Sequence, residues 1–253
     1  MFKKVKLYAL DMDGTIWKGN ELCTGALELI EFLQKNYKVV FHTNSSTKTK
    51  IAIKNKLNQF NINCNLNEIY TSASLVIDYL KENKILNDLY VIGSKDFKTE
   101  LINEGLSLQS SKYAKNVIVG MDINFSYRKI KNALQVLNRK GQFIACNIDA
   151  NFPIGNGKIM PGCGAMVGAI IGASGVIPYV VGKPNTYLIK KISNEFNVKY
   201  DEIVVIGDSY LSDIVMAQVI GCNFIYIGSD KSISNKCNNL LEVLQILKGE
   251  NKL

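Results

Sequence analysis

Two aspartates with one residue between them, Asp11 and Asp13, directly follow the apolar run Val5 to Leu10. The run has the length and composition of a short buried strand, and Gly14 allows the chain to bend sharply after it. Ligands of parallel α/β sheets bind at the carboxyl ends of strands, so an acid pair at this place suggests chemistry. Asp is also a common turn residue, so the pair alone could simply open a turn.

Polar side chains follow three further apolar runs in the same way. Each has an ordinary alternative explanation, because hydroxyl residues cap helices and a lysine before a proline is usually at the surface. Together they add a hydroxyl donor, a cation and a third acid to the pair, a set suited to magnesium-assisted phosphoryl transfer. The residues are Thr43 and Asn44 after Lys38 to His42, Lys183 after Tyr179 to Gly182, and Asp208 after Ile203 to Ile206, with Asp213 on the next helix.

Charge explains why such a set is needed. An aspartate can attack phosphorus to form an aspartyl-phosphate, but it then approaches a substrate of its own sign. Two unit charges about 4 Å apart repel by about 4 kcal/mol at an effective dielectric constant of about 20. Magnesium held by Asp11 and Asp208, with Lys183 and the Thr43 hydroxyl, would neutralise that repulsion. Asp13 can protonate the leaving oxygen and later take a proton from water, which contributes about a hundred- to ten-thousandfold in rate.

Strand and helix signals alternate along the chain, which predicts an α/β protein with a parallel sheet. The first pattern breaks off near residue 84 and resumes at 179, and the residues between have strands and helices of their own. We expect a core of residues 1–83 and 179–253 with an inserted α/β unit of residues 84–178. The expected strands are Val5–Leu10, Lys38–His42, Leu89–Gly93, Val117–Met121, Phe143–Asn147, Tyr179–Gly182, Ile203–Ile206 and Asn223–Ile227. The expected helices run from Thr24 to near Asn36, Thr47–Phe60, Ser74–Lys84, Asp96–Gly105, Arg128–Asn138, Pro161–Ala173, Pro184–Phe196 and onward from Asn238.

One stretch of the insert imitates a membrane span. Ile159 to Val181 has no ionised side chain, and its glycines are spaced as in membrane helices. Pro161, Gly175 and Pro178 argue against a single span, because Pro161 fits a helix start and Gly175 a helix end. We therefore expect a tightly packed helix and no membrane partner.

The composition restricts the partners. The formal net charge is +8, but only Arg128 and Arg139 are arginines among 30 basic residues, and the charge is scattered. Without a basic stripe interleaved with aromatic residues we expect no nucleic-acid partner. An anionic small substrate remains compatible with this charge.

The cysteines and the histidine argue against multi-histidine metal sites and against serine or cysteine triads. The 6 cysteines form no Cys-x-x-Cys pair, which suits reduced thiols and a cytoplasmic location. His42 is the only histidine and is expected to pack within its strand. A single histidine excludes multi-histidine metal sites and argues against a serine or cysteine triad.

The strand-end motifs resemble, in their order along the chain, the four motifs of the haloacid dehalogenase superfamily. These motifs are Asp11-Met12-Asp13-Gly14-Thr15, Thr43-Asn44, Gly182-Lys183-Pro184, and Gly207-Asp208 with Asp213. Three insert segments are similar to the cap of the NagD and 4-nitrophenyl-phosphatase branch: Val119-Gly120-Met121-Asp122, Asn147-Ile148-Asp149 and Pro161-Gly162-Cys163-Gly164. The resemblance runs over nearly the whole chain.

The resemblance implies a Rossmann-like core with a type C2 cap, and a Mg²⁺-dependent phosphatase that acts on small phosphate monoesters. It also implies roles for the motif residues. Asp11 would be the nucleophile and Asp13 the general acid and base; Asp11, the Asp13 carbonyl and Asp208 would bind the metal; Thr43, Asn44 and Lys183 would hold the phosphoryl group; Asp213 and Gly14 would support them.

Some questions stay open on the sequence. Ser45 and Ser212 replace an asparagine and a threonine that are usual in relatives, without removing a charge or a ligand. Dehalogenases lack the second acid and P-type ATPases have threonine there, so Asp13 favours a phosphatase. A receiver-like phospho-aspartate signalling module and a basic nucleic-acid-binding protein are the alternative classes.

The substrate is not determined by the motifs. The resemblance allows nucleotide monophosphates, sugar phosphates, phosphoglycolate, pyridoxal phosphate and aryl phosphates. Asn147 and Asp149 lie in a loop of the insert that either contacts the substrate or is simply solvated, and they are the candidates for selectivity. The cap is also a reasonable place for a homodimer contact.

Overall fold

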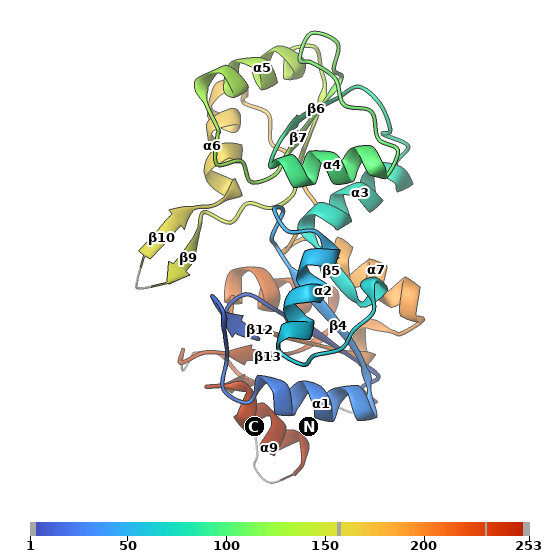
Figure 1. Cartoon of the computed structure of the whole chain (residues 1–253), viewed down its shortest axis with the longest axis vertical. Helices are drawn as coiled ribbons and strands as arrows, with labels where there is room; N and C mark the ends of the chain where they lie inside the picture. Colours follow the sequence, from blue (N-terminus) through green and yellow to red (C-terminus); the bar gives the residue numbers. More distant parts are fainter. Residues whose placement is uncertain (1–3, 156–157, 231, 250–253) are drawn as a thin grey trace. The chain divides into compact units, whose positions relative to one another are not determined.

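The structure, a computed structural model, describes residues 4–155, 158–230 and 232–249 (Figure 1). The strands are β1 (Leu7–Asp11), β2 (Trp17–Lys18), β3 (Glu21–Leu22), β4 (Lys38–Thr43), β5 (Ile69–Thr71), β6 (Leu89–Ile92), β7 (Asn116–Val119), β8 (Gln142–Ala145), β9 (Asn151–Gly155), β10 (Lys158–Pro161), β11 (Tyr179–Val180), β12 (Ile203–Gly207), β13 (Asn223–Ile227) and β14 (Lys236–Cys237). The helices are α1 (Ala26–Asn36), α2 (Lys50–Gln59), α3 (Ser72–Glu82), α4 (Lys95–Asn103), α5 (Tyr127–Leu137), α6 (Cys163–Ser174), α7 (Tyr187–Phe196), α8 (Val215–Ile220) and α9 (Leu240–Leu247). Short helices of other types are η1 (Leu66–Glu68), η2 (Tyr200–Glu202) and η3 (Tyr210–Ile214).

The chain divides into two compact units. The first comprises residues 1–43, 50–70 and 183–253, and the second comprises residues 44–49 and 71–182. Helix α3 and the short segment 44–49 therefore group with the second unit. The assignment of residues 1–83 and 179–253 to a catalytic core, and of 84–178 to a cap, stays a prediction.

The first unit is built on a six-stranded sheet in the order β14-β13-β12-β1-β4-β5. Its central strand β1 pairs in parallel with β12 on one side and β4 on the other, so Leu10 lies opposite both Ile206 and Phe41. Parallel neighbours end at the same edge of a sheet. The residues that follow β1, β4 and β12 are thereby brought to one edge, as the sequence predicts.

Both faces of this sheet are buried. Tyr8, Leu10 and Phe41 belong to a core cluster with apolar residues of α1, α2 and α9, and Figure 1 shows α1 and α9 next to each other. Leu7 and Ala9, whose side chains point to the opposite face, are also fully buried. Burial on both sides explains the continuous apolar runs that predicted these strands.

Helix α1 lies where the sequence predicts a helix, but it begins at a different residue. It begins at Ala26 with Gly25 as its N-cap residue in the left-handed conformation, whereas the helix was expected to run from Thr24. Leu29, Ile30 and Leu33 are buried as an amphipathic pattern requires, and Leu27 of the same helix is only partly buried. The helix was placed correctly and its start was not.

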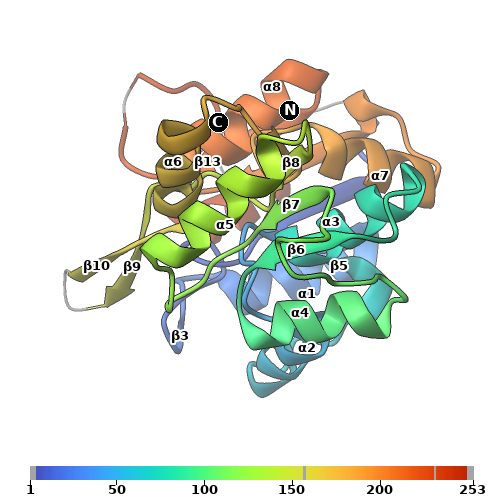
Figure 2. The ribbon, with the colours of Figure 1, turned by 90° about the horizontal axis from the view of Figure 1, so that it is seen from above.

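The second unit contains a four-stranded sheet in the order β11-β8-β7-β6, paired in parallel throughout. Helices α5 and α6 pack on each other and on β7, as Figure 2 shows. Val117, Val119 and Phe143 of the sheet share a core cluster with residues of both helices, including Val136 and Ile170. The second unit is therefore itself an α/β unit with a parallel sheet.

Two expectations about residues 159–181 are wrong. Pro161 ends strand β10, which pairs with β9 in a hairpin, and the helix begins only at Cys163. Strand β11 was expected to continue the first sheet, but Tyr179 and Val180 pair with β8 of the second sheet. Gly175 does end helix α6 in the left-handed conformation, as predicted.

Several short elements carried no usable signal. The sequence did not predict β5, β14 or the β2–β3 and β9–β10 hairpins, and the two helices expected to begin at Thr47 and Pro184 begin at Lys50 and Tyr187. Within the described residues, none of the helices has the length and apolar character needed to cross a membrane.

The core of the first unit can be tested on helix α1. Leu33 is fully buried, so Leu33→Ala should lower the free energy of unfolding by about 2–5 kcal/mol through lost burial and a cavity. Leu27→Ala, on the same helix but partly exposed, should cost clearly less. Urea unfolding followed by circular dichroism measures both, and equal losses would contradict the described packing.

Candidate active site

The central feature of the site is a buried ammonium group between two carboxylates. Lys183 Nζ donates hydrogen bonds to Asp11 Oδ1 and to Asp213 Oδ1, each at 2.6 Å. All three side chains are buried, with side-chain exposures of 4%, 6% and 0%. The structure thus brings together residues from the end of β1, from the segment after β11 and from η3.

One ammonium group faces three carboxyl groups at this place. Burial opposes the charge of Lys183, but Asp11 and Asp213 raise the pKa of its ammonium group above the ordinary value. Burial raises the pKa of the Asp11 carboxyl well above its usual range; Lys183 lowers it, and Asp213 and Asp208 raise it further. The pKa of Asp208 is also raised, by burial and by Asp213. One ammonium group does not compensate three neighbouring carboxylates.

Asp208 packs against the turn that follows β1. Its Oδ1 accepts a hydrogen bond from Thr15 Oγ1 at 3.1 Å. Gly14 has a φ of 100°, and a Cβ atom at this position would lie 2.2 Å from Asp208 Oδ2. A side chain at position 14 would therefore displace the Asp208 carboxylate, and the supporting role of Gly14 in the site stays a prediction.

Asp13 is exposed and is held at both of its carboxylate oxygens. Oδ1 accepts a hydrogen bond from Trp17 Nε1 at 2.8 Å, and Oδ2 accepts one from Thr43 Oγ1 at 3.1 Å. The hydroxyl predicted to bind phosphate is thus adjacent to the predicted general acid and base. An exposed, oriented carboxylate can exchange a proton with a ligand in the site.

His42 lies next to Asp11 in the first unit. It is fully buried in β4, and its Nδ1 is 3.8 Å from Asp11 Oδ1. Burial and the nearby Lys183 hold the pKa of the imidazole well below its usual range. The ligand atoms of Asp11, His42 and Asp213 lie within 4.8 Å of one another and form a candidate metal site among the described residues. Lys183 already donates to both carboxylates of that set.

Asn44 belongs to the second unit, although it directly follows Thr43 in the chain. Its Nδ2 donates to Asp149 Oδ1 at 3.0 Å, and its main-chain carbonyl accepts from Asn147 Nδ2 and from Ser72 Oγ, both at 2.6 Å. Asn147 Oδ1 also accepts from the amide of Asp149. Both polar ends of the buried Asn147 amide are therefore used inside this unit, and the loop of Asn147 and Asp149 holds Asn44.

Ser45 and Ser212 are the two departures from the family pattern. Ser45 Oγ is 3.3 Å from Thr47 Oγ1, within the segment that groups with the second unit. Ser212 lies in η3 and is partly exposed. The roles of both residues stay predictions.

Sequence reasoning overlooked Thr15, Trp17 and Ser72 as partners of site residues. Thr15 was quoted only as part of its motif. Trp17 could have been found from the sequence, because it is the single tryptophan of the chain and lies four residues after Asp13. Ser72 has no local signal, because its bond to Asn44 joins residues 28 positions apart.

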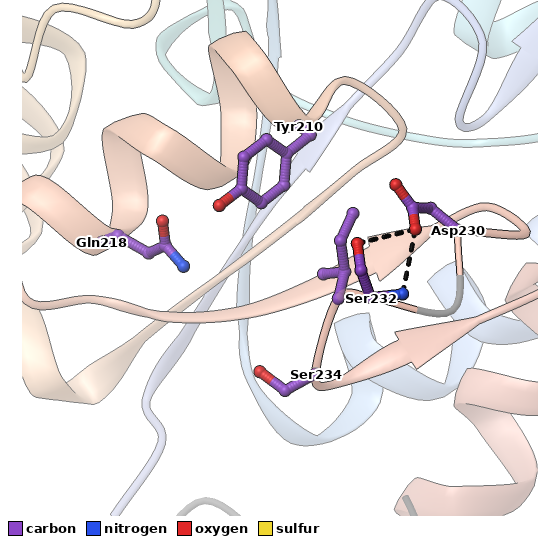
Figure 3. Close-up of a pocket in the computed structure, with 6 residues that line it drawn as sticks. Tyr210, Gln218, Asp230, Ser232 and Ser234 are labelled. Atoms are coloured by element: carbon purple, nitrogen blue, oxygen red, sulfur yellow. Dashed lines mark hydrogen bonds between the residues drawn. The ribbon is translucent and has the colours of Figure 1, made fainter.

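The first unit also has a pocket that is lined by other residues than the predicted site residues. It has a volume of about 290 Å³ and is lined by Tyr210, Gln218, Asp230, Ser232, Ile233 and Ser234. Figure 3 shows that one carboxylate oxygen of Asp230 accepts hydrogen bonds from the amide and hydroxyl of Ser232. The predicted site residues are not among those that line it, so we place the chemistry at the strand ends.

Comparison with known proteins identifies the family of the chain. The family model of the haloacid dehalogenase-like hydrolases matches residues 8–107, and a HAD-hydrolase-like model matches residues 180–240. An acid sugar phosphatase of Staphylococcus epidermidis is 31% identical over 226 residues, which are 89% of this chain and 87% of the relative. The chain therefore belongs to the haloacid dehalogenase-like hydrolases and is a phosphatase of that superfamily.

Solved structures share the fold over most of the chain. A p-nitrophenyl phosphatase from Archaeoglobus fulgidus has a TM-score of 0.88 at 22% identity and covers 96% of this chain and 99% of its own. NagD from Escherichia coli K-12 has a TM-score of 0.82 at 25% identity, with 92% and 96% covered. The resemblance to the NagD and nitrophenyl-phosphatase branch and the α/β fold are confirmed.

The contact between Gly14 and Asp208 yields a prediction. Gly14→Ala should lower kcat/KM for a phosphate ester by about a hundredfold, because displacing a site group by about 1 Å has effects of this size. Gly19→Ala is the matched control: Gly19 also has a positive φ of 62°, but nothing lies within 4 Å of its Cβ position. Phosphate release and urea unfolding measure both variants. Wild-type activity of Gly14→Ala would contradict the close approach.

Proposed function

We propose that this phosphatase hydrolyses small phosphate monoesters through an aspartyl-phosphate on Asp11. The observation that carries the proposal is the buried Lys183 ammonium shared by Asp11 and Asp213, next to the Asp208 carboxylate. A carboxylate that attacks phosphorus must meet positive charge and must be held in place. Lys183 supplies the charge and fixes Asp11 by a short hydrogen bond.

We propose Mg²⁺ as the ion that completes the charge balance, with Asp11, Asp208 and the Asp13 carbonyl as ligands. The excess of carboxylates, and the space that Gly14 leaves for Asp208, fit a small cation with oxygen ligands. The alternative set with His42 is less suitable, because Lys183 is already bonded to two of its members. Bound at the proposed ligands, Mg²⁺ would offset the negative charges of the phosphate and of Asp11.

In this reaction each residue of the site has its own role. Asp11 attacks phosphorus while Asp13 gives a proton to the leaving oxygen, and Asp13 then takes a proton from the water that hydrolyses the aspartyl-phosphate. Thr43, Asn44 and Lys183 hold the phosphoryl oxygens, and Asp213 keeps Lys183 in position. The exposure of Asp13 and the hydrogen bond between Thr43 and Asp13 support this division.

For the substrate we propose sugar phosphates as the first class to examine, because Staphylococcus relatives over most of the chain are named acid sugar phosphatases. Nucleotide monophosphates, pyridoxal phosphate and aryl phosphates are the other classes. The selectivity roles of Asn147 and Asp149, a homodimer contact through residues 84–178 and a cytoplasmic location stay predictions.

The nucleophile is tested by Asp11→Asn. The variant should lose essentially all hydrolysis of a phosphate monoester, because an amide does not form the acyl-phosphate. Asp201→Asn, an exposed aspartate of the same unit, should leave turnover unchanged. Steady-state phosphate release measures both, and undiminished turnover of Asp11→Asn would remove Asp11 from the mechanism.

The metal and the substrate are tested in one screen of phosphate esters ranked by kcat/KM. Activity should disappear with EDTA and return with added Mg²⁺, and sugar phosphates should rank first. Activity that persists after chelation contradicts the metal. A nucleotide monophosphate at the head of the ranking contradicts the sugar class and leaves the phosphatase reaction intact.

A further inference from the structure

Trp17 is a fully buried side chain that donates into the site. Its Nε1 lies 2.8 Å from Asp13 Oδ1, and its exposure is 0%. The indole nitrogen is a donor only, so it can bond a carboxylate oxygen but cannot accept a proton from it. In this geometry Asp13 Oδ1 accepts the hydrogen bond of the indole N–H.

The indole itself is fixed from several sides. It stacks on Phe60, with ring centroids 6.0 Å apart, and Lys56 Nζ lies 4.3 Å from its ring centroid. Trp17 also begins the β2–β3 hairpin, and its carbonyl accepts a hydrogen bond from the amide of Gly14 at 2.8 Å. A side chain so packed has little rotational freedom, so its N–H points in one direction.

We propose that Trp17 is a positioning residue that orients the Asp13 carboxylate for proton transfer. The proposal rests on the proposed function, in which Asp13 is the general acid and base. With Oδ1 held by Trp17, Oδ2 is the oxygen that exchanges the proton. Oδ2 is also the oxygen next to the Thr43 hydroxyl.

The proton movements balance in both steps. In the first, the bond between Asp11 and phosphorus forms, the ester P–O bond breaks, and the proton on Asp13 Oδ2 passes to the leaving oxygen. In the second, water attacks phosphorus, its proton returns to Asp13 Oδ2, and the bond to Asp11 breaks. Oδ1 stays hydrogen-bonded to Trp17 throughout.

The single tryptophan makes an atomic test practicable. Replacement of Trp by β-(3-benzothienyl)alanine in a tryptophan auxotroph changes only position 17 and exchanges N–H for sulfur with nearly the same shape. For an alkyl phosphate, kcat should fall about tenfold or more, a part of the about hundred- to ten-thousandfold that acid–base catalysis supplies. KM should stay unchanged. For 4-nitrophenyl phosphate, whose leaving group needs little protonation, kcat should fall much less.

A matched variant separates positioning from packing. Leu33→Ala removes buried packing of helix α1 and leaves the Trp17 N–H and its ring contacts unchanged, so it should lower the free energy of unfolding without changing the ratio of alkyl to aryl kcat. If the benzothienyl protein keeps the wild-type ratio, or if Leu33→Ala changes that ratio equally, Trp17 does not position Asp13.

Asp13→Asn distinguishes failure of this inference from failure of the proposed function. If Asp13→Asn hydrolyses alkyl phosphates at the wild-type rate, Asp13 is not the acid and base, and both the assignment and the role of Trp17 are overturned. If Asp13→Asn is selectively slow on alkyl phosphates while the benzothienyl protein is not, only the role of Trp17 is overturned.

Discussion

The buried contact of Lys183 with Asp11 and Asp213 is the interaction on which the arrangement of the first unit depends. An isolated buried charge is very unfavourable, and removal of one partner from a buried pair typically costs about 3–5 kcal/mol. The ammonium group therefore draws the end of β1, the segment after β11 and η3 to one point. The same contact leaves carboxylate charge uncompensated, so the site is suited to a substrate and an ion that complete the balance.

The order of the strands in the first sheet explains where this contact lies. Strand β1 lies between β12 and β4, so the residues after all three strands reach the same edge. Ligands of parallel α/β sheets bind at such an edge. The turn after β1 then orients its side chains individually: Gly14 makes room for Asp208, and Trp17 and Thr43 each hold one oxygen of Asp13.

Thr43 and Asn44 are adjacent in the chain, but their hydrogen-bond partners belong to different units. Thr43 bonds Asp13 within the first unit, whereas Asn44 is held by Ser72, Asn147 and Asp149 of the second. The loop expected to select substrates uses both polar ends of Asn147 for hydrogen bonds inside its own unit. These hydrogen bonds hold Asn44, and a sequence pattern of polar residues does not show such contacts.

The sequence by itself determined the α/β class, the main strands and helices, and the acids, hydroxyl and lysine at the strand ends. Those features depend on residue type and local spacing, which the chain shows directly. Only the tertiary structure decided that β11 joins the second sheet, that β5 and β14 exist, and that Trp17 and Ser72 bond Asp13 and Asn44. Strands of two or three residues have no periodicity to read, and the direction of a side chain depends on packing from distant segments.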